Sequence, residues 1–185
     1  MSTFEELAGL PGSGPWPEQF SATGRGTHRE GFVVKFVPAR GASWIGNFQP
    51  GLTSLHGVYR HPNRHHLLVV SGGQGYVVDP ETRALIQTVG GAIQSVHIHA
   101  EHELLLLDHQ GTDFEAIGRT GRAWRTRRLS WDGFGDLKIG KNEIVGKGWN
   151  AVDQRWQPFS VDVRTGRSSG GGYQLTDADD SEQLA

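Results

Sequence analysis

The sequence predicts an all-β chain made of antiparallel meander units of about 40 residues each. Three observations lead to this fold class. Short runs rich in Val, Ile, Leu and aromatic residues recur along the chain, as in β-strands. The 27 glycines suit a protein with many tight turns. A turn motif also repeats at similar spacing, which indicates that one structural unit is used several times.

Residues 1–31 are expected to form an N-terminal arm or a short helix. Two overlapping capping boxes within Ser2–Glu6 predict a helix over about residues 4–9. The rest of this segment is rich in Gly, Pro, Ser and Thr and is expected to be a loop. Trp16 and Phe20 are the residues that would anchor this loop on the surface of the domain.

Residues 32–175 are predicted to form a single all-β domain. Its expected strands, in order, cover residues 32–37, 43–48, 55–61, 67–71, 76–79, 85–89, 93–99, 104–108, 113–117, 123–129, 137–139, 143–149, 158–163 and 169–174. Turn residues separate these runs, and Asp79–Thr82 has the type I signature, with Asp first and Pro second. Residues 176–185 carry acidic side chains and little apolar surface, so they are expected to form a flexible tail.

The turns give the best evidence for repetition. Three of them begin at a threonine six residues after an aromatic residue: Thr82 after Tyr76, Thr120 after Phe114 and Thr165 after Phe159. The segments 41–44 and 121–124 also match, since both begin with Gly and end with Trp, and this makes the turn at Arg40 a fourth copy. Counted from Arg40 and the three threonines, successive turns are 42, 38 and 45 residues apart.

A period near 40 residues with about four strands per unit is typical of β-propeller blades. The segment 65–82, which reads HHLLVV and then YVVDPET, resembles the YVTN and WD40-like propeller repeats. The resemblance covers roughly residues 32–174 and implies a propeller-like fold. The first unit supplies only about two strands, so we expect about three and a half blades. A β-sandwich and a cupin-like barrel are the alternative folds.

Two further segments, 129–133 and 156–159, resemble small bacterial proteins of unknown function, a resemblance that implies no activity. The formal net charge of −2 argues against a nucleic-acid binder, which would usually be strongly basic. The absence of cysteine excludes disulfides and thiolate metal sites. No signal peptide and no apolar run long enough to cross a bilayer are visible, so we expect a cytoplasmic protein without a membrane partner.

The first group of candidate site residues is rich in histidine. His97 and His99 are two positions apart on a predicted strand and therefore share a face, as a pair of imidazole metal ligands would need. The run from Gly91 through these two residues to Glu103 resembles the first cupin motif. This resemblance implies a divalent metal ion, Fe, Mn or Zn, held by His97, His99 and Glu103. The alternative is that these are solvated or hydrogen-bonded histidines on a half-exposed strand, with His102 explained by the repeat.

The second group combines arginine and tryptophan. Five arginines lie within residues 119–128, and Arg125 and Arg127 share one strand face. Their guanidinium groups suit a carboxylate or phosphate partner, although a charged edge strand that resists aggregation is the alternative. Trp149 and Trp156 could form a recognition surface, although most of the six tryptophans are expected to pack in the core.

No nucleophile elbow, phosphate loop or dinucleotide fingerprint is present. The sequence therefore favours a non-catalytic module that binds a protein partner, such as an inhibitor or immunity-like protein, with no cofactor. A metal-dependent, cupin-like enzyme using His97, His99 and Glu103 is the alternative. A third hypothesis is self-association through an open sheet edge.

Overall fold

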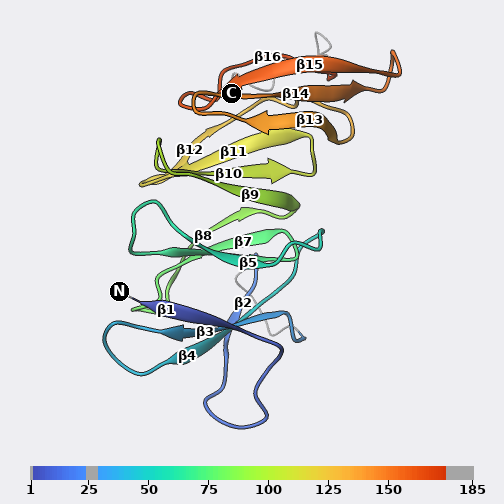
Figure 1. Cartoon of the computed structure of the whole chain (residues 1–185). Helices are drawn as coiled ribbons and strands as arrows, with labels where there is room; N and C mark the ends of the chain where they lie inside the picture. The colour runs from blue at the N-terminus through green and yellow to red at the C-terminus, as the bar shows by residue number, and fades with distance from the viewer. Residues whose placement is uncertain (1, 24–28, 174–185) are drawn as a thin grey trace. The chain divides into compact units, whose positions relative to one another are not determined.

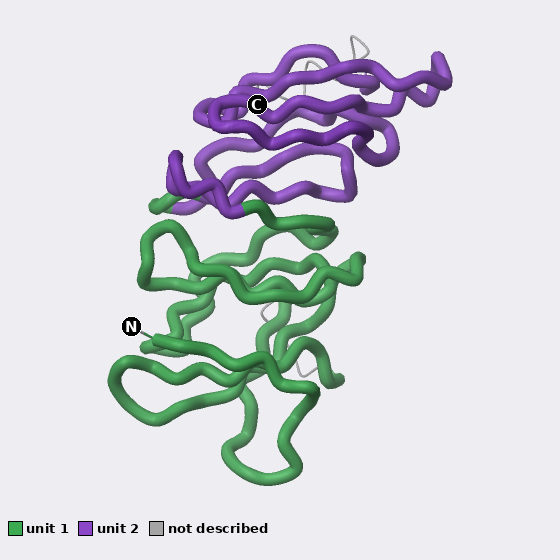
Figure 2. The backbone as a smooth tube through the Cα atoms, in the orientation of Figure 1, with its two compact units in different colours: residues 1–97, 118–120 green, residues 98–117, 121–185 purple. Residues whose placement is uncertain are grey.

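Four four-stranded sheets, A to D, make up the described part of the chain, residues 2–23 and 29–173, in a computed structural model (Figure 1). The secondary-structure elements of these described residues are all β-strands, so the predicted all-β class is confirmed. The chain divides into two compact units, residues 1–97 with 118–120 and residues 98–117 with 121–185 (Figure 2). The expected acidic tail, residues 176–185, lies outside the described residues.

Sheets A and B belong to the first unit. The strand order in sheet A is β1 (Thr3–Leu7), β3 (Phe32–Val37), β4 (Trp44–Phe48) and β2 (Glu18–Phe20). Sheet B is an antiparallel meander of β5 (Gly57–Arg60), β6 (Leu67–Ser71), β7 (Gln74–Val78) and β8 (Leu85–Gly90).

Sheet D and most of sheet C belong to the second unit. Sheet C has β9 (Ile93–His99), β10 (Leu104–His109), β11 (Asp113–Gly118) and β12 (Gly121–Arg125) in chain order. Sheet D has β13 (Phe134–Ile139), β14 (Glu143–Asn150), β15 (Arg155–Asp162) and β16 (Ser168–Gly170), and all its neighbouring strands are antiparallel.

The N-terminal residues depart from the prediction. The expected helix over residues 4–9 is wrong, because β1 pairs antiparallel with β3 from Thr3–Val37 to Leu7–Val33. Pairing with β3 satisfies the backbone of a segment too short to be a stable helix on its own. Strand β2 lies at the other edge of sheet A, parallel to β4.

With β1 and β2 in place, sheet A has four strands rather than the two that the sequence predicted. Phe20 is buried as expected, whereas Trp16 is 94% exposed and does not anchor the arm. The sheets are open, and none of those described closes into a barrel, so the cupin-like barrel is not the fold of this part of the chain. The number of propeller blades stays a prediction.

Each unit has its own hydrophobic core. In the first unit the buried residues are Phe20, Val34, Phe36, Trp44, Phe48, Leu67, Val69, Tyr76 and Val78. In the second they are Leu104, Leu106, Phe114, Ala116, Trp124, Leu129, Ile144, Phe159, Val161 and Val163. The aromatic residues that precede the repeated threonine turns are thus all core residues, which explains the spacing seen in the sequence.

Candidate binding surface

The outer face of sheet D carries two facing tryptophans. Strands β14 and β15 pair with Trp149 opposite Trp156. Because side chains alternate along a strand, these residues point away from the core residues Ile144 and Phe159. The two indole rings contact edge to face, with centroids 5.4 Å apart and planes at 63°. Trp156 is 46% exposed, so much of its ring faces solvent.

A second aromatic pair, Trp131 and Tyr173, lies at the same end of the sheet. Their ring centroids are 4.8 Å apart, and Trp131 is 38% exposed. The backbone N–H of Trp131 donates to the carbonyl of Trp149 at 3.0 Å, which joins this pair to the first. The hydroxyl of Ser130 also accepts from the N–H of Trp149 at 2.7 Å and donates to the carbonyl of Gly133 at 2.6 Å.

Arg128 completes this group, which we call the aromatic cluster: Arg128, Trp131, Trp149, Trp156 and Tyr173. The guanidinium carbon of Arg128 lies 5.5 Å from the ring centroid of Trp131 and 5.0 Å from that of Tyr173, within cation–π range. Its nitrogens donate to the carbonyls of Ser130 at 2.9 Å and Trp131 at 2.8 Å. Arg128 therefore links the Trp131–Tyr173 pair to the backbone of the loop before β13.

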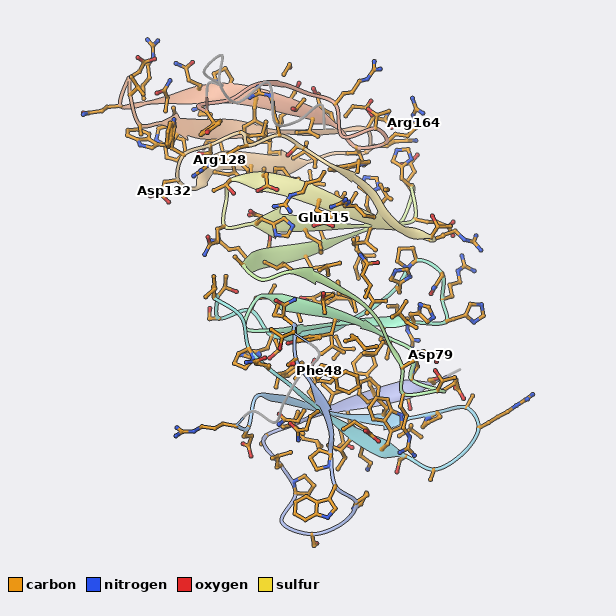
Figure 3. The ribbon with its side chains drawn as sticks, turned by 180° about the vertical axis from the view of Figure 1, so that it is seen from behind. Phe48, Asp79, Glu115, Arg128, Asp132 and Arg164 are labelled. Carbon is orange, nitrogen blue, oxygen red and sulfur yellow. The ribbon has the colours of Figure 1, made fainter. Side chains whose placement is uncertain are left out.

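A polar groove of about 400 Å³ lies at sheet D away from the aromatic cluster. It is lined by Asn142, Glu143, Ser160, Asp162, Arg167, Ser168 and Ser169. Ser160 and Asp162 are on the same face of β15 as Trp156, because they follow it at intervals of two residues. Figure 3 shows the two ends of the second unit, with Arg128 and Asp132 at one and Arg164 at the other. The outer face of sheet D thus combines an aromatic and a polar region.

The predicted binding residues fall in two places. Trp149 and Trp156 belong to the aromatic cluster, and Arg127 lies beside it, where its guanidinium donates to the carbonyls of Tyr173 and Gly170. Arg125 is on sheet C, with its Nε 2.6 Å from a carboxylate oxygen of Asp113. That hydrogen bond raises the pKa of the Arg125 guanidinium. Both arginines therefore have intramolecular partners.

The predicted metal ligands lie at the end of β9 and in the turn that follows. His97 is exposed, with its Nε2 3.4 Å from the hydroxyl of Ser95. His99 is half-buried and stacks on His102, and Glu103 has the positive φ of 49° that the turn requires. Among the described residues, no three His, Asp or Glu side chains are grouped in a way that could hold a metal ion. The ligand set His97, His99 and Glu103 stays a prediction.

A buried contact between a histidine and a glutamate was not predicted from the sequence. His109 on β10 and Glu115 on β11 lie diagonally across the strand pair, with Nε2 and Oε2 3.1 Å apart and side chains 6% and 5% exposed. Glu115 is labelled in Figure 3. In the register of β10 on β11, His109 is opposite Asp113 and Glu115 is opposite Leu107, so the His109–Glu115 contact is a diagonal one that the sequence alone does not show. Among the described residues, no helix is long and apolar enough to cross a membrane.

Comparisons with known proteins do not assign a family. No family model matches the chain, and no curated protein matches it. Among solved structures, S. cerevisiae Dbp5 bound to Nup159, Gle1, IP6 and ADP is 14% identical over 66% of this chain and 34% of the other, with a TM-score of 0.38. The N-terminal domain of Nup159 is 13% identical over 65% and 34%, also with a TM-score of 0.38.

A structure described as the eukaryotic initiation factor is 6% identical over 78% of this chain and 42% of the other, with a TM-score of 0.40. The chain thus spans between a third and a half of the length of these structures. At these TM-scores, the likeness establishes neither a fold family nor a function for the chain.

Proposed function

We propose that the protein is a non-catalytic module that binds a protein partner through the aromatic cluster of sheet D. The observation that supports this proposal is the exposure of Trp131 and Trp156 at one end of one sheet. Tryptophan, tyrosine and arginine are the residue types most enriched where binding energy concentrates in protein interfaces. The cluster contains all three.

The cluster is also rigid, which favours tight binding. Trp131 is held by its backbone bond to Trp149, and Arg128 is stacked on two rings and bonded to two carbonyls. Side chains that are ordered before binding lose less conformational entropy when a partner docks. An inhibitor or immunity-like protein, which must hold its target tightly, fits this kind of surface.

Charge supports a protein rather than a nucleic-acid partner. The net charge is −2, and one of the cations of sheet D, Lys147, lies 2.6 Å from the carboxylate of Asp136. The chain therefore lacks the strong overall positive charge that attracts phosphates in nucleic-acid binding.

The proposal is tested by placing a photoreactive amino acid at Pro158, which lies on the same face of β15 as Trp156 and is exposed. We expect it to cross-link one other protein in a lysate of the source organism. The purified partner should then bind the wild-type chain, and Trp131→Ala or Trp156→Ala should weaken the Kd by about 30-fold, equivalent to about 2 kcal/mol.

Ile86→Ala is the matched control, because Ile86 is another apolar side chain of similar exposure, 49%, on β8. It should leave the Kd unchanged. A Kd that is unaffected by both tryptophan substitutions would contradict the proposal. Cross-links formed only between copies of this chain would assign the surface to self-association instead.

A further inference from the structure

His99 and His102, whose rings are in contact, each have a buried nitrogen without a hydrogen-bond partner in the described chain. Among its buried side-chain nitrogens and oxygens, only Nδ1 of His99 and Nε2 of His102 lack a hydrogen-bond partner. Buried polar atoms without partners are rare in folded proteins, and each one needs a physical explanation, such as a bound water or ion. That both belong to side chains in contact with each other points to one shared partner.

The hydrogen bond of His99 fixes which of its nitrogens is available. Nε2 lies 3.1 Å from the carbonyl oxygen of Gly140. A carbonyl only accepts hydrogen bonds, so Nε2 carries the proton and, in the neutral ring, Nδ1 carries the free lone pair. An imidazole that donates one N–H to a backbone carbonyl and directs its other nitrogen elsewhere is the usual arrangement of a metal-bound histidine.

The distance between the rings is compatible with a shared ion. The ring centroids of His99 and His102 are 5.2 Å apart, with planes at 12°. Zinc lies about 2 Å from a histidine nitrogen, so the centroids of two imidazoles on one ion lie within about 6 Å of each other. The rings are nearly parallel, so the His102 side chain must turn about its Cβ–Cγ bond for its lone pair to meet that of His99.

We propose that Nδ1 of His99 and Nε2 of His102 together bind a divalent transition-metal ion such as Zn²⁺, Ni²⁺ or Cu²⁺, with water completing its coordination. These are the ions that imidazole ligands suit. The hairpin turn between β9 and β10 keeps the two residues together, and the ion pair of Glu101 with Lys141 links this turn to the one after β13. The site is separate from the aromatic cluster, so it goes beyond the proposed binding function.

This ligand pair differs from the one that the cupin-like resemblance implied. That set used His97 and Glu103 with His99. Here His102 replaces both, because the turn brings its ring onto that of His99. The two sets predict different effects of the same substitutions, which makes them separable by experiment.

The test uses the full chain titrated calorimetrically with Zn²⁺ or Ni²⁺ alone after treatment with a chelator. We expect one ion per chain, with affinity falling from neutral to mildly acidic pH because imidazole must lose its proton to bind a metal. His99→Ala and His102→Ala should each weaken binding by at least about tenfold. His97→Ala and Glu103→Gln should leave it unchanged.

Nuclear magnetic resonance of the wild-type protein keeps the test independent of whether the variants fold. The ring signals of His99 and His102 should shift on addition of Zn²⁺, whereas that of the exposed His65 should not. Absence of binding would overturn the proposal and assign the unpartnered nitrogens to water. Binding lost in His97→Ala and Glu103→Gln but retained in His102→Ala would overturn it in favour of the cupin-like set.

Discussion

Trp44 and Trp124 make the same hydrogen bond in different units of the chain. The indole nitrogen of Trp44 donates to the carbonyl of Pro80 at 2.9 Å, and that of Trp124 donates to the carbonyl of Val163 at the same distance. Each bond joins a strand of one sheet, β4 or β12, to the turn after the third strand of the next. The sequence match around the two tryptophans therefore has a structural counterpart within each unit.

The repeated turns share a backbone conformation. The residue after Arg40 or after the repeated threonine has positive φ in every copy: 96° at Gly41, 65° at Arg83, 118° at Gly121 and 72° at Gly166. At the turn that receives Trp44, the guanidinium carbon of Arg83 lies 6.0 Å from the ring centroid. At the turn that receives Trp124, a Cβ on Gly166 would lie only 2.7 Å from the ring.

Gly166→Ala should therefore be more destabilising than Gly41→Ala. Both substitutions impose a left-handed φ on a residue with a Cβ, which costs about 1 kcal/mol. Only alanine at Gly166 also collides with Trp124, because nothing lies within 4 Å of the Cβ position at Gly41. We expect the free energy of unfolding to fall by about 1 kcal/mol for Gly41→Ala and by about 2–4 kcal/mol for Gly166→Ala. Urea denaturation measures both, and equal losses would contradict the role given to Trp124.

Trp124→Phe tests the hydrogen bond itself. The smaller phenylalanine ring still fills much of the space of the Trp124 ring in the core of the second unit, but the carbonyl of Val163 loses its indole donor. An unpaired buried polar group costs about 1–3 kcal/mol, and we expect the free energy of unfolding to fall by that amount. Trp156→Phe is the control, because Trp156 is half-exposed. Its indole nitrogen has no hydrogen bond to the described residues, so this substitution breaks none there. Similar losses in both variants would show that ring size matters more than the bond.

The strands after residue 31 could be predicted because their signals are local. Val, Ile, Leu and aromatic residues between turn formers identify each of the fourteen expected strands, although their ends shift. Strand β1 could not be predicted, since Thr3–Leu7 carries local helix-capping signals while its partner Phe32–Val37 is far along the chain. Strand β2 has only three residues and pairs parallel to β4, which no local pattern reveals.

The candidate surfaces, like the strands, could be predicted only where the signal is local in the sequence. The tryptophan pair of sheet D could be anticipated from composition and strand alternation. The stacking of Tyr173 with Trp131 could not, because it depends on how the segment after β16 returns to the loop before β13. The contact of His99 with His102 was missed for a different reason. Alternation along a strand places His99 on the same face as His97, but His102 lies in the turn after β9, where this alternation does not apply.

The stability of the first unit should depend on pH through His61. This side chain is 4% exposed, and burial lowers its pKa below the ordinary value of 6.5. The unfolded chain therefore binds this proton at higher pH than the folded one. The stability that the buried, neutral His61 contributes is fully present above about pH 6.5, and the free energy of unfolding falls as the pH drops below that value.

Denaturation curves for the wild-type protein and His61→Gln from neutral to mildly acidic pH measure this dependence. The variant should lose part of the slope of unfolding free energy against pH. His65→Gln is the matched control, because His65 lies in the same loop and is exposed. A slope that is the same in the wild-type protein and His61→Gln would exclude His61 as its source.

The buried pair of His109 and Glu115 should be more costly to break than to replace. Glu115→Ala removes the carboxylate oxygen 3.1 Å from His109 Nε2 and leaves that nitrogen without this partner, so we expect a loss of about 3 kcal/mol in unfolding free energy. The double variant His109→Leu with Glu115→Leu removes both polar groups and should recover much of this loss. Glu5→Ala, which breaks an exposed pair with Lys35, should change stability little. A double variant less stable than Glu115→Ala would contradict this expectation. It would show that the His109–Glu115 contact stabilises the pairing of β10 and β11 beyond supplying each buried polar group with a partner.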